Sequence, residues 1–230
     1  MTSSGTGKAV LFDIDGTLMD SNYLQVQAWS EAFDQLARPV DDARIHRVIA
    51  LDSAALLQTL LGDRAEELGE QAKKAHTAAY EKLADRLRPF TAARDLLAAV
   101  GDRGVAVVLA TSAPENELKL LRKALDAEQF VTAVTSAEDA ETAKPNPGIL
   151  QAALVKTGVA AQDAVMVGDT VWDGQAAAAA GITFVGMRSG GISTGELSDA
   201  GAVAVYDDPA DLLAQLDTSP LSALWTPAGS

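Results

Sequence analysis

The stretch KAVLFDIDGTL, residues 8–18, decides both the fold and the candidate site. Residues 9–12 are continuously apolar, which is typical of a strand buried on both faces of a parallel sheet. Asp13 and Asp15 follow at the carboxyl end of that strand, the edge where open α/β sheets bind ligands. Side chains two positions apart on an extended segment share one side, and Gly16 lets the chain turn away sharply. We therefore expect the two carboxylates to converge.

Two other interpretations of this stretch fail on residue spacing. A calcium loop aligned on the glycine needs a carboxylate at its first position and Glu at its twelfth, which here are Leu11 and Asn22. A phosphate loop at GTGK, residues 5–8, has a misplaced first glycine and Ala9 where Ser or Thr must stand. It also precedes the strand, and residues 1–7 are instead predicted to be a disordered start.

The composition excludes several classes of function. The 230 residues are 48% hydrophobic with a net charge of −14, which favours a soluble globular protein and argues against binding nucleic acid or anionic membranes. The absence of cysteine excludes disulfides and thiolate zinc sites. Because the chain has no membrane-spanning stretch and no signal-peptide pattern, we expect a cytoplasmic protein. Its oligomeric state cannot be predicted.

The chain changes texture near Pro89. Before it, apolar spacing predicts helices only, over 21–37, 42–49, 53–61 and 64–87. After it, strands and helices alternate. Strands are expected at 105–110, 131–135, 164–167, 182–186 and 203–206, and helices from Pro89 to Val100 and over 115–126, 146–157, 171–180 and 208–216.

This order predicts an α/β fold with a doubly wound parallel sheet, a Rossmann-like core that carries an inserted helical domain. Residues 1–19 and 89–216 would form the core, and residues 20–88 the insertion, called the cap below. Residues 217–230 are expected to be a loose tail, although the apolar Leu221, Leu224 and Trp225 could dock it.

Polar residues follow the later strands at the same edge of the sheet. Thr111 and Ser112 end one strand and precede a helix, where a hydroxyl and backbone N–H groups can bind an anion. Lys144 stands before Pro145, which restricts its backbone. Gly168-Asp169 and Asp173 end a third strand and open the next helix. Each alone is ordinary, as a helix cap or a surface lysine, but together they suit Mg²⁺ and phosphoryl transfer. His76 is expected in the core and His46 on a solvated face.

Four motifs in this order resemble those of the haloacid dehalogenase-like superfamily, specifically phosphatases with a helical cap, similar to phosphoglycolate phosphatase and β-phosphoglucomutase. The motifs are Asp13-Ile14-Asp15-Gly16-Thr17, Thr111, Lys144-Pro145, and Gly168-Asp169 with Asp173, and the resemblance covers residues 8–216. It implies a phosphoric monoester hydrolase that acts on a small phosphorylated metabolite.

The resemblance also implies a role for each residue. Asp13 would attack phosphorus to form an aspartyl-phosphate, and Asp15 would protonate the leaving alcohol and then activate water. Mg²⁺ would be bound by the carboxylates of Asp13 and Asp169 and the backbone carbonyl of Asp15, with Asp173 acting through water or the ligands. Thr111 and Lys144, with the backbone N–H groups that follow Thr111, would hold the phosphoryl oxygens, and Ser112 is expected at the same phosphate site. Leu51, Asp52 and Ser53 occupy the turn that resembles the family's substrate-specificity loop.

Three alternatives remain at this stage. The first is a sugar phosphomutase. The resemblance implies that such an enzyme needs a His and an Arg where this chain has Gln25 and Ser53, and Arg44 or Arg47 could substitute only by reaching the substrate. The second is a dehalogenase, which Asp15 and Gly16 disfavour because the resemblance ties these residues to phosphoryl transfer. A non-catalytic phosphoacceptor or metabolite-binding module, like a receiver domain, has no helical cap and places its acidic residue on a middle strand.

Overall fold

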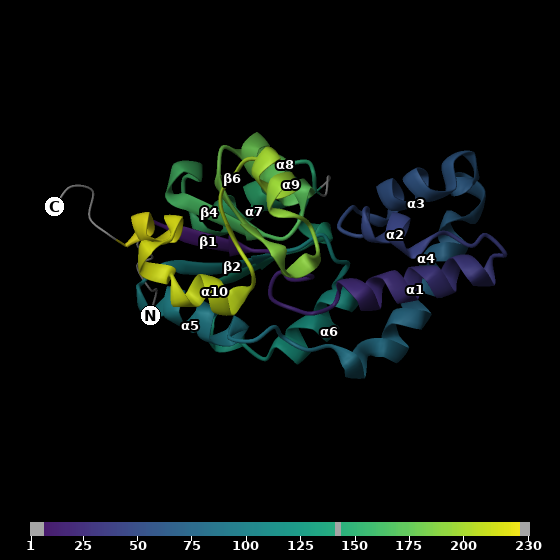
Figure 1. Ribbon diagram of the computed structural model, residues 1–230, viewed down its shortest axis with the longest axis horizontal. Coiled ribbons are helices and arrows are strands. Elements are labelled where there is room, and N and C mark those ends of the chain that lie inside the picture. Colours follow the sequence, from purple (N-terminus) through teal and green to yellow (C-terminus); the bar gives the residue numbers. More distant parts are fainter. Residues whose placement is uncertain (1–6, 141–143, 226–230) are drawn as a thin grey trace.

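The computed structural model describes residues 7–140 and 144–225, and its centre is one parallel sheet of six strands (Figure 1). The strand order is β3-β2-β1-β4-β5-β6, so the chain builds the sheet outward from β1 in one direction and then crosses to the other side at β4. The bounds are β1 Ala9–Phe12, β2 Ala106–Ala110, β3 Ala133–Thr135, β4 Ala164–Gly168, β5 Thr183–Met187 and β6 Ala202–Tyr206.

Helices cover both faces of this sheet (Figure 1). One layer consists of α5 Ala93–Asp102, α6 Glu115–Leu125 and α10 Pro209–Ala214, and the other of α7 Gly148–Thr157, α8 Val171–Ala180 and α9 Thr194–Asp199. Alternate residues of β1 point to the two layers: Val10 and Phe12 pack in one core, Ala9 and Leu11 in the other. All four are fully buried, which explains why β1 is apolar without alternation.

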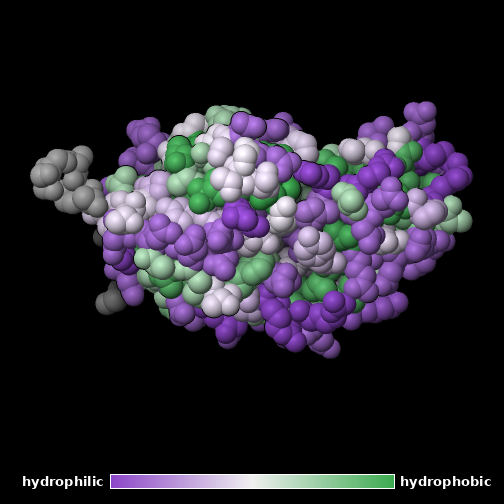
Figure 2. All heavy atoms as spheres, in the orientation of Figure 1, coloured by the Kyte–Doolittle hydropathy of each residue, from purple (hydrophilic) through white to green (hydrophobic). Residues whose placement is uncertain are grey.

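Four further helices come between β1 and β2 in the chain. In space they lie beyond the carboxyl ends of the strands (Figure 1). They are α1 Asn22–Gln35, α2 Asp42–His46, α3 Ser53–Leu61 and α4 Ala65–Leu83. They share an apolar core of their own that contains Trp29, Phe33, Leu57 and Ala72. Figure 2 shows mainly hydrophilic residues on the surface over these helices, in keeping with the net charge of −14. The assignment of residues 20–88 to a separate cap domain stays a proposal.

The predicted α/β fold class is confirmed, and each predicted strand is present within two residues of its expected bounds. Helices 53–61 and 171–180 have the bounds expected, and 42–49 ends earlier, at His46. Helix α9 was not predicted because it has only six residues. Its visible signal is the capping box, in which the side chains of Ser193 and Glu196 each accept from the other's backbone N–H.

The prediction of a loose tail is wrong for residues 217–225. The segment forms two short 3₁₀ helices, Leu216–Thr218 and Pro220–Leu224, and Leu221 and Leu224 are buried in the core layer of α5 and α10. The guanidinium of Arg103 lies 5.1 Å from the ring centre of Trp225. The apolar residues that could dock the tail therefore do so. Residues 226–230 lie outside the described residues, as do residues 1–6 of the disordered start expected over 1–7.

Candidate active site

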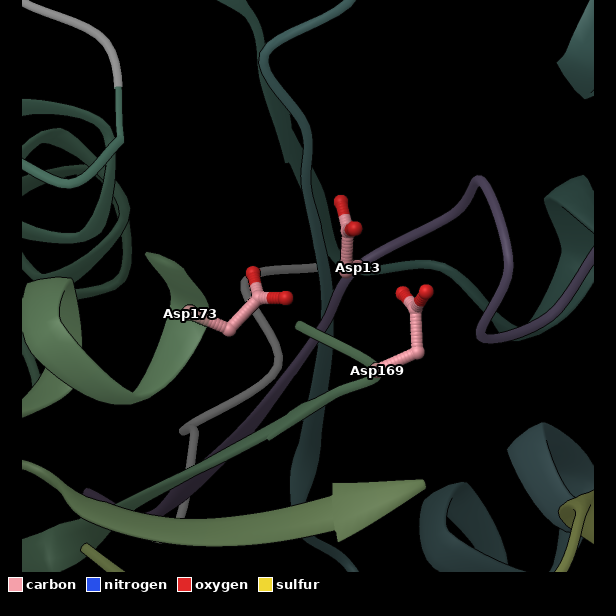
Figure 3. Close-up of side chains that lie close together, drawn as sticks. All are labelled: Asp13, Asp169 and Asp173. Carbon is pink, nitrogen blue, oxygen red and sulfur yellow. The ribbon is translucent and has the colours of Figure 1, made fainter. Parts of the chain in front are cut away.

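The carboxylates of Asp13 and Asp169 meet because β1 and β4 are neighbouring parallel strands. Phe12 pairs with Val167 in the sheet register, so the residues that follow them leave the sheet side by side. This is the point where the strand order reverses, the usual ligand site of open α/β sheets. Asp173 joins them from the first turn of α8 (Figure 3). One carboxylate oxygen of each residue lies within 4.8 Å of the others.

Asp173 is held in place by the start of its own helix. Its Oδ2 accepts hydrogen bonds from the backbone N–H and the hydroxyl of Thr170, at 3.0 Å and 2.6 Å. This capping box begins α8 and leaves the second oxygen facing Lys144.

Lys144 is buried among these acids. Its Nζ lies 2.8 Å from Asp13 Oδ1 and 2.7 Å from Asp173 Oδ1. Although burial disfavours an ammonium group, the two carboxylates raise the pKa of Lys144 above its usual value, so it stays charged. The bland interpretation of Lys144 as a surface lysine is therefore wrong.

Asp169 is fixed by two donors, one from the loop after β1 and one from the first residue of α1. Thr17 Oγ1 donates to Asp169 Oδ1 at 2.9 Å, and Asn22 Nδ2 donates to Oδ2 at 3.0 Å. Two glycines make room for this carboxylate. A Cβ at Gly16 or at Gly190 would overlap the Asp169 side chain, and Gly16 also has a positive φ of 72°.

Asp15 lies apart from the acid cluster, although it is only two residues from Asp13. Its Oδ1 accepts a 2.6 Å hydrogen bond from Ser21 Oγ. Ser21 stands at the N-cap of α1, but its hydroxyl donates to Asp15 and makes no capping bond. Burial raises the pKa of Asp15, and hydrogen bonds from Ser21 and Gln25 offset part of that effect.

The environment separates the protonation behaviour of these groups. Burial raises the pKa of Asp13 to about 7, with Lys144 lowering it and Asp173 raising it further. Burial, followed by the charges of Asp173 and Asp13, raises the pKa of Asp169 well above its usual value. Three acids so close together bind a proton or a cation readily.

The cluster fits a divalent metal ion in its donor chemistry. Asp13, Asp169 and Asp173 offer only hard oxygen ligands, all buried, and no thiolate or imidazole lies among them. The Asp15 carboxylate points to Ser21, so only the backbone carbonyl of Asp15, the ligand that the resemblance implies, is left for a metal. The carboxylate of Asp173, which was expected to act through water or the other ligands, lies within the cluster itself.

A pocket opens over Asp13 and Asp15 between the sheet and α1–α4. Thr111, Ser112 and Lys144 line it, as expected for a phosphate site. Thr111 Oγ1 accepts a 3.0 Å hydrogen bond from Ala113 N, which orders the turn that leads into α6. Ser112 Oγ is buried with no hydrogen-bond partner among the described residues, so it is available to a substrate oxygen.

The turn of Leu51, Asp52 and Ser53 divides into two roles. Leu51 and Ser53 line the pocket. Asp52 instead caps α3, where its Oδ1 accepts from the backbone N–H groups of Ala54 and Ala55 at 2.9 Å and 3.0 Å. The Asp52 side chain therefore has a structural role at the start of α3.

Arg44, Arg47 and His46 of the cap do not line this pocket. Arg47 pairs with Glu196 of α9, and Arg44 lines a separate groove with Arg38 and Leu60. The expectation of a solvated His46 is wrong, because its Nε2 lies 2.9 Å from Gly190 O and its ring stacks on Tyr23.

Several residues around the pocket were missed by the sequence analysis as functional residues. Thr17, Ser21 and Asn22 hold the acids, and Gln25, His76 and Glu117 line the pocket wall. His76 is buried as expected, yet it faces the pocket. Only Thr17 lay within a recognised motif. Ser21 and Asn22 reach their acids from the start of α1, and Gln25, His76 and Glu117 meet from α1, α4 and α6; no local spacing reveals these contacts.

Comparisons with known proteins agree with this geometry. A family model described as haloacid dehalogenase-like hydrolase matches residues 10–187. The phosphoglycolate phosphatase of Rhodospirillum rubrum is 33% identical over 217 residues, 89% of each chain. The phosphorylated carbohydrates phosphatase of Thermotoga maritima is 27% identical over 86% of this chain and 93% of its own. The crystal structure of a hydrolase from Pseudomonas syringae superposes with a TM-score of 0.87 at 35% identity, covering 92% of this chain and 98% of that one.

Proposed function

The chain belongs to the haloacid dehalogenase-like hydrolases, and from that premise we propose that it is a phosphatase that hydrolyses a small organic phosphate monoester through Asp13. The relatives named phosphoglycolate phosphatase and phosphorylated carbohydrates phosphatase support this reaction class. Among the described residues no helix is long and apolar enough to cross a bilayer.

One observation carries the proposal. Asp13 and Asp15 are two residues apart and line the same pocket, yet different partners hold them: Lys144 pairs with Asp13, and Ser21 donates to Asp15. Two carboxyl groups in different environments can take the separate roles of nucleophile and proton carrier.

The reaction proceeds in two balanced steps. An oxygen of Asp13 attacks phosphorus, the ester P–O bond breaks, and Asp15 gives its proton to the departing alcohol oxygen. Asp15 then takes a proton from water, whose oxygen attacks the aspartyl-phosphate. This releases inorganic phosphate and restores Asp13. Lys144 and the hydroxyls of Thr111 and Ser112 would hold the phosphoryl oxygens.

The divalent metal would be Mg²⁺, which prefers a few carboxylates and shares a substrate phosphate. Asp13 and Asp169 with the backbone carbonyl of Asp15 would bind it, and Asp173 is close enough to contribute. When bound, the ion would neutralise charge between the nucleophile and the phosphate.

The alternative of a sugar phosphomutase receives no support from the pocket. Gln25 donates to Glu117 and lies against His76, so it is not free to move protons. Ser53 brings no charge for a second phosphate, and Arg44 and Arg47 are directed elsewhere. We therefore keep hydrolysis as the proposal.

Phosphate release from 4-nitrophenyl phosphate tests the reaction class. We expect turnover with Mg²⁺, its loss with excess chelator, and its loss in Asp13→Asn. Asp20→Asn is the matched control, because Asp20 is an exposed carboxylate in the same loop. Turnover of Asp13→Asn close to that of the unaltered protein would contradict the assignment of the nucleophile.

A further inference from the structure

A buried acid that the proposed mechanism does not use lies on the pocket wall. Glu117, on α6, has an exposed fraction of 5% and lines the pocket that contains Asp13 and Asp15. Gln25 Nε2 donates to its Oε2 at 2.9 Å. Burying a carboxylate costs free energy unless the group is paired or hydrogen-bonded.

The orientation of Gln25 fixes the protonation of His76. Because the Gln25 amide nitrogen donates to Glu117, its Oε1 faces His76 Nε2 at 2.8 Å and accepts the proton there. Burial lowers the pKa of His76 to about 3, so the ring is neutral and Nδ1 is an acceptor. The ring is clamped between Trp29 and Tyr80, with ring centres 4.1 Å and 5.9 Å away.

Two acceptors therefore lie side by side on this wall. His76 Nδ1 and Glu117 Oε1 are 3.6 Å apart, and both residues line the pocket. No donor of the described residues is shown between them. A hydroxyl group of a bound ligand can donate to either atom, whereas a carboxylate or a phosphate can donate to neither.

The same pocket has no cation to spare for a second anion. Among its described lining residues, Lys144 is the only lysine or arginine, and it already pairs with Asp13 and Asp173. The three acids on the lining, Asp13, Asp15 and Glu117, repel further negative charge. The phosphate itself has Lys144 and a metal, but nothing equivalent faces the alcohol part.

We propose that Glu117, held by the hydrogen bond from Gln25, selects phosphate monoesters whose alcohol part carries hydroxyl groups and no second anionic group. The substrate class is thus a small polyol or sugar monophosphate rather than a phosphorylated carboxylic acid or a bisphosphate. This inference rests on the proposed phosphatase function and names the substrate class of the same site. It differs from the substrate in the printed name of the Rhodospirillum rubrum relative.

Two esters of equal length test it: 2-hydroxyethyl phosphate and 2-phosphoglycolate, which differ in a terminal hydroxymethyl or carboxylate group. Like unit charges about 5 Å apart at an effective dielectric of about 20 repel by an amount equivalent to roughly 10²-fold in rate or affinity. Solvent in the pocket weakens this. We expect kcat/KM at pH 8 with Mg²⁺ to favour 2-hydroxyethyl phosphate at least ~10-fold.

Glu117→Gln removes the charge and keeps the shape of the side chain. We expect it to reduce that preference at least ~5-fold, mainly by raising kcat/KM for 2-phosphoglycolate. Glu115→Gln is the control, because Glu115 lies on the same helix, is partly exposed and pairs only with Lys119 among the ion pairs of the described residues. It should leave the preference unchanged. A preference of the unaltered protein for 2-phosphoglycolate would overturn the proposal without needing any variant.

Calorimetric binding of the two esters to Asp13→Asn with Mg²⁺ gives a readout independent of turnover. Tighter binding of 2-hydroxyethyl phosphate, reduced when Glu117→Gln is added, supports the proposal. Equal binding, or a ratio unaffected by Glu117→Gln, overturns it. Absence of turnover on both esters and on 4-nitrophenyl phosphate would instead contradict the phosphatase function, and the binding ratio would still decide the role of Glu117.

Discussion

The titration of Glu117 predicts how folding stability depends on pH. Burial raises the pKa of Glu117 from 4.5 to about 7 in the folded protein. Between these values the folded chain keeps a proton that the unfolded chain has lost, so raising the pH favours unfolding. Glu117 contributes fully below pH 4.5, and its contribution disappears as the pH passes 7.

The size of the effect follows from the same shift. At 1.36 kcal/mol per pH unit, a rise from 4.5 to about 7 corresponds to about 3 kcal/mol of unfolding free energy. Glu117→Gln cannot titrate and avoids this loss. We therefore expect the unfolding free energy of the variant, relative to that of the unaltered protein, to rise by about 3 kcal/mol between pH 4.5 and pH 8.

Urea unfolding at several pH values, in chelator, measures this difference. Titrations common to both proteins, such as those of Asp13 and Asp169, cancel in it. His76 acts in the opposite sense, since its pKa of about 3 makes stability rise between pH 3 and 6.5, and it too is present in both. Glu115→Gln should parallel the unaltered protein. If this difference stays constant or falls with pH, the pKa of Glu117 is not raised in the folded protein.

Three further predictions concern the site and the cap. Lys144→Met leaves buried acids without their cation, so it should cost about 3–5 kcal/mol of stability in chelator and recover much of it with Mg²⁺, as thermal unfolding would show. Gly190→Ala places a Cβ against a metal-site carboxylate and should weaken Mg²⁺ binding at least ~10-fold by calorimetry, whereas Gly195→Ala, which meets no atom, should not; equal affinities would contradict the close approach. Asp52→Ala should lower stability by about 1 kcal/mol and leave the substrate preference unchanged, whereas Ser53→Ala should change the preference and leave stability unchanged. A changed preference in Asp52→Ala would show that Asp52 contacts substrate and would contradict this assignment.

The sheet could be predicted because its buried strands are continuous apolar runs in the sequence. β1 is apolar at every position because both its faces are covered, and acids follow directly where the strand ends. The expected placement of Asp13 and Asp169 needed only two neighbouring parallel strands. Short elements carry weaker signals, and α9 and the docked segment 217–225 were therefore missed or misjudged.

The partners of the acids could not be predicted from spacing. Ser21 points its hydroxyl at Asp15 and makes no capping bond to its own helix. Glu117 meets Gln25 across 92 positions, through the packing of α1 against α6. Such contacts join separate elements, and no period of the sequence encodes them.

The proposed reaction requires a covalent phosphate intermediate on Asp13, and mass spectrometry of an acid-quenched reaction detects such an intermediate. The Asp15→Asn variant is the material of choice, with 4-nitrophenyl phosphate and Mg²⁺. The nitrophenolate leaves without needing a proton, whereas the later attack of water needs the missing base. We expect a burst of nitrophenolate and a phosphate adduct, labile to hydroxylamine, on the peptide that contains Asp13. An adduct on another residue, or steady release of phosphate with neither burst nor adduct, would contradict it.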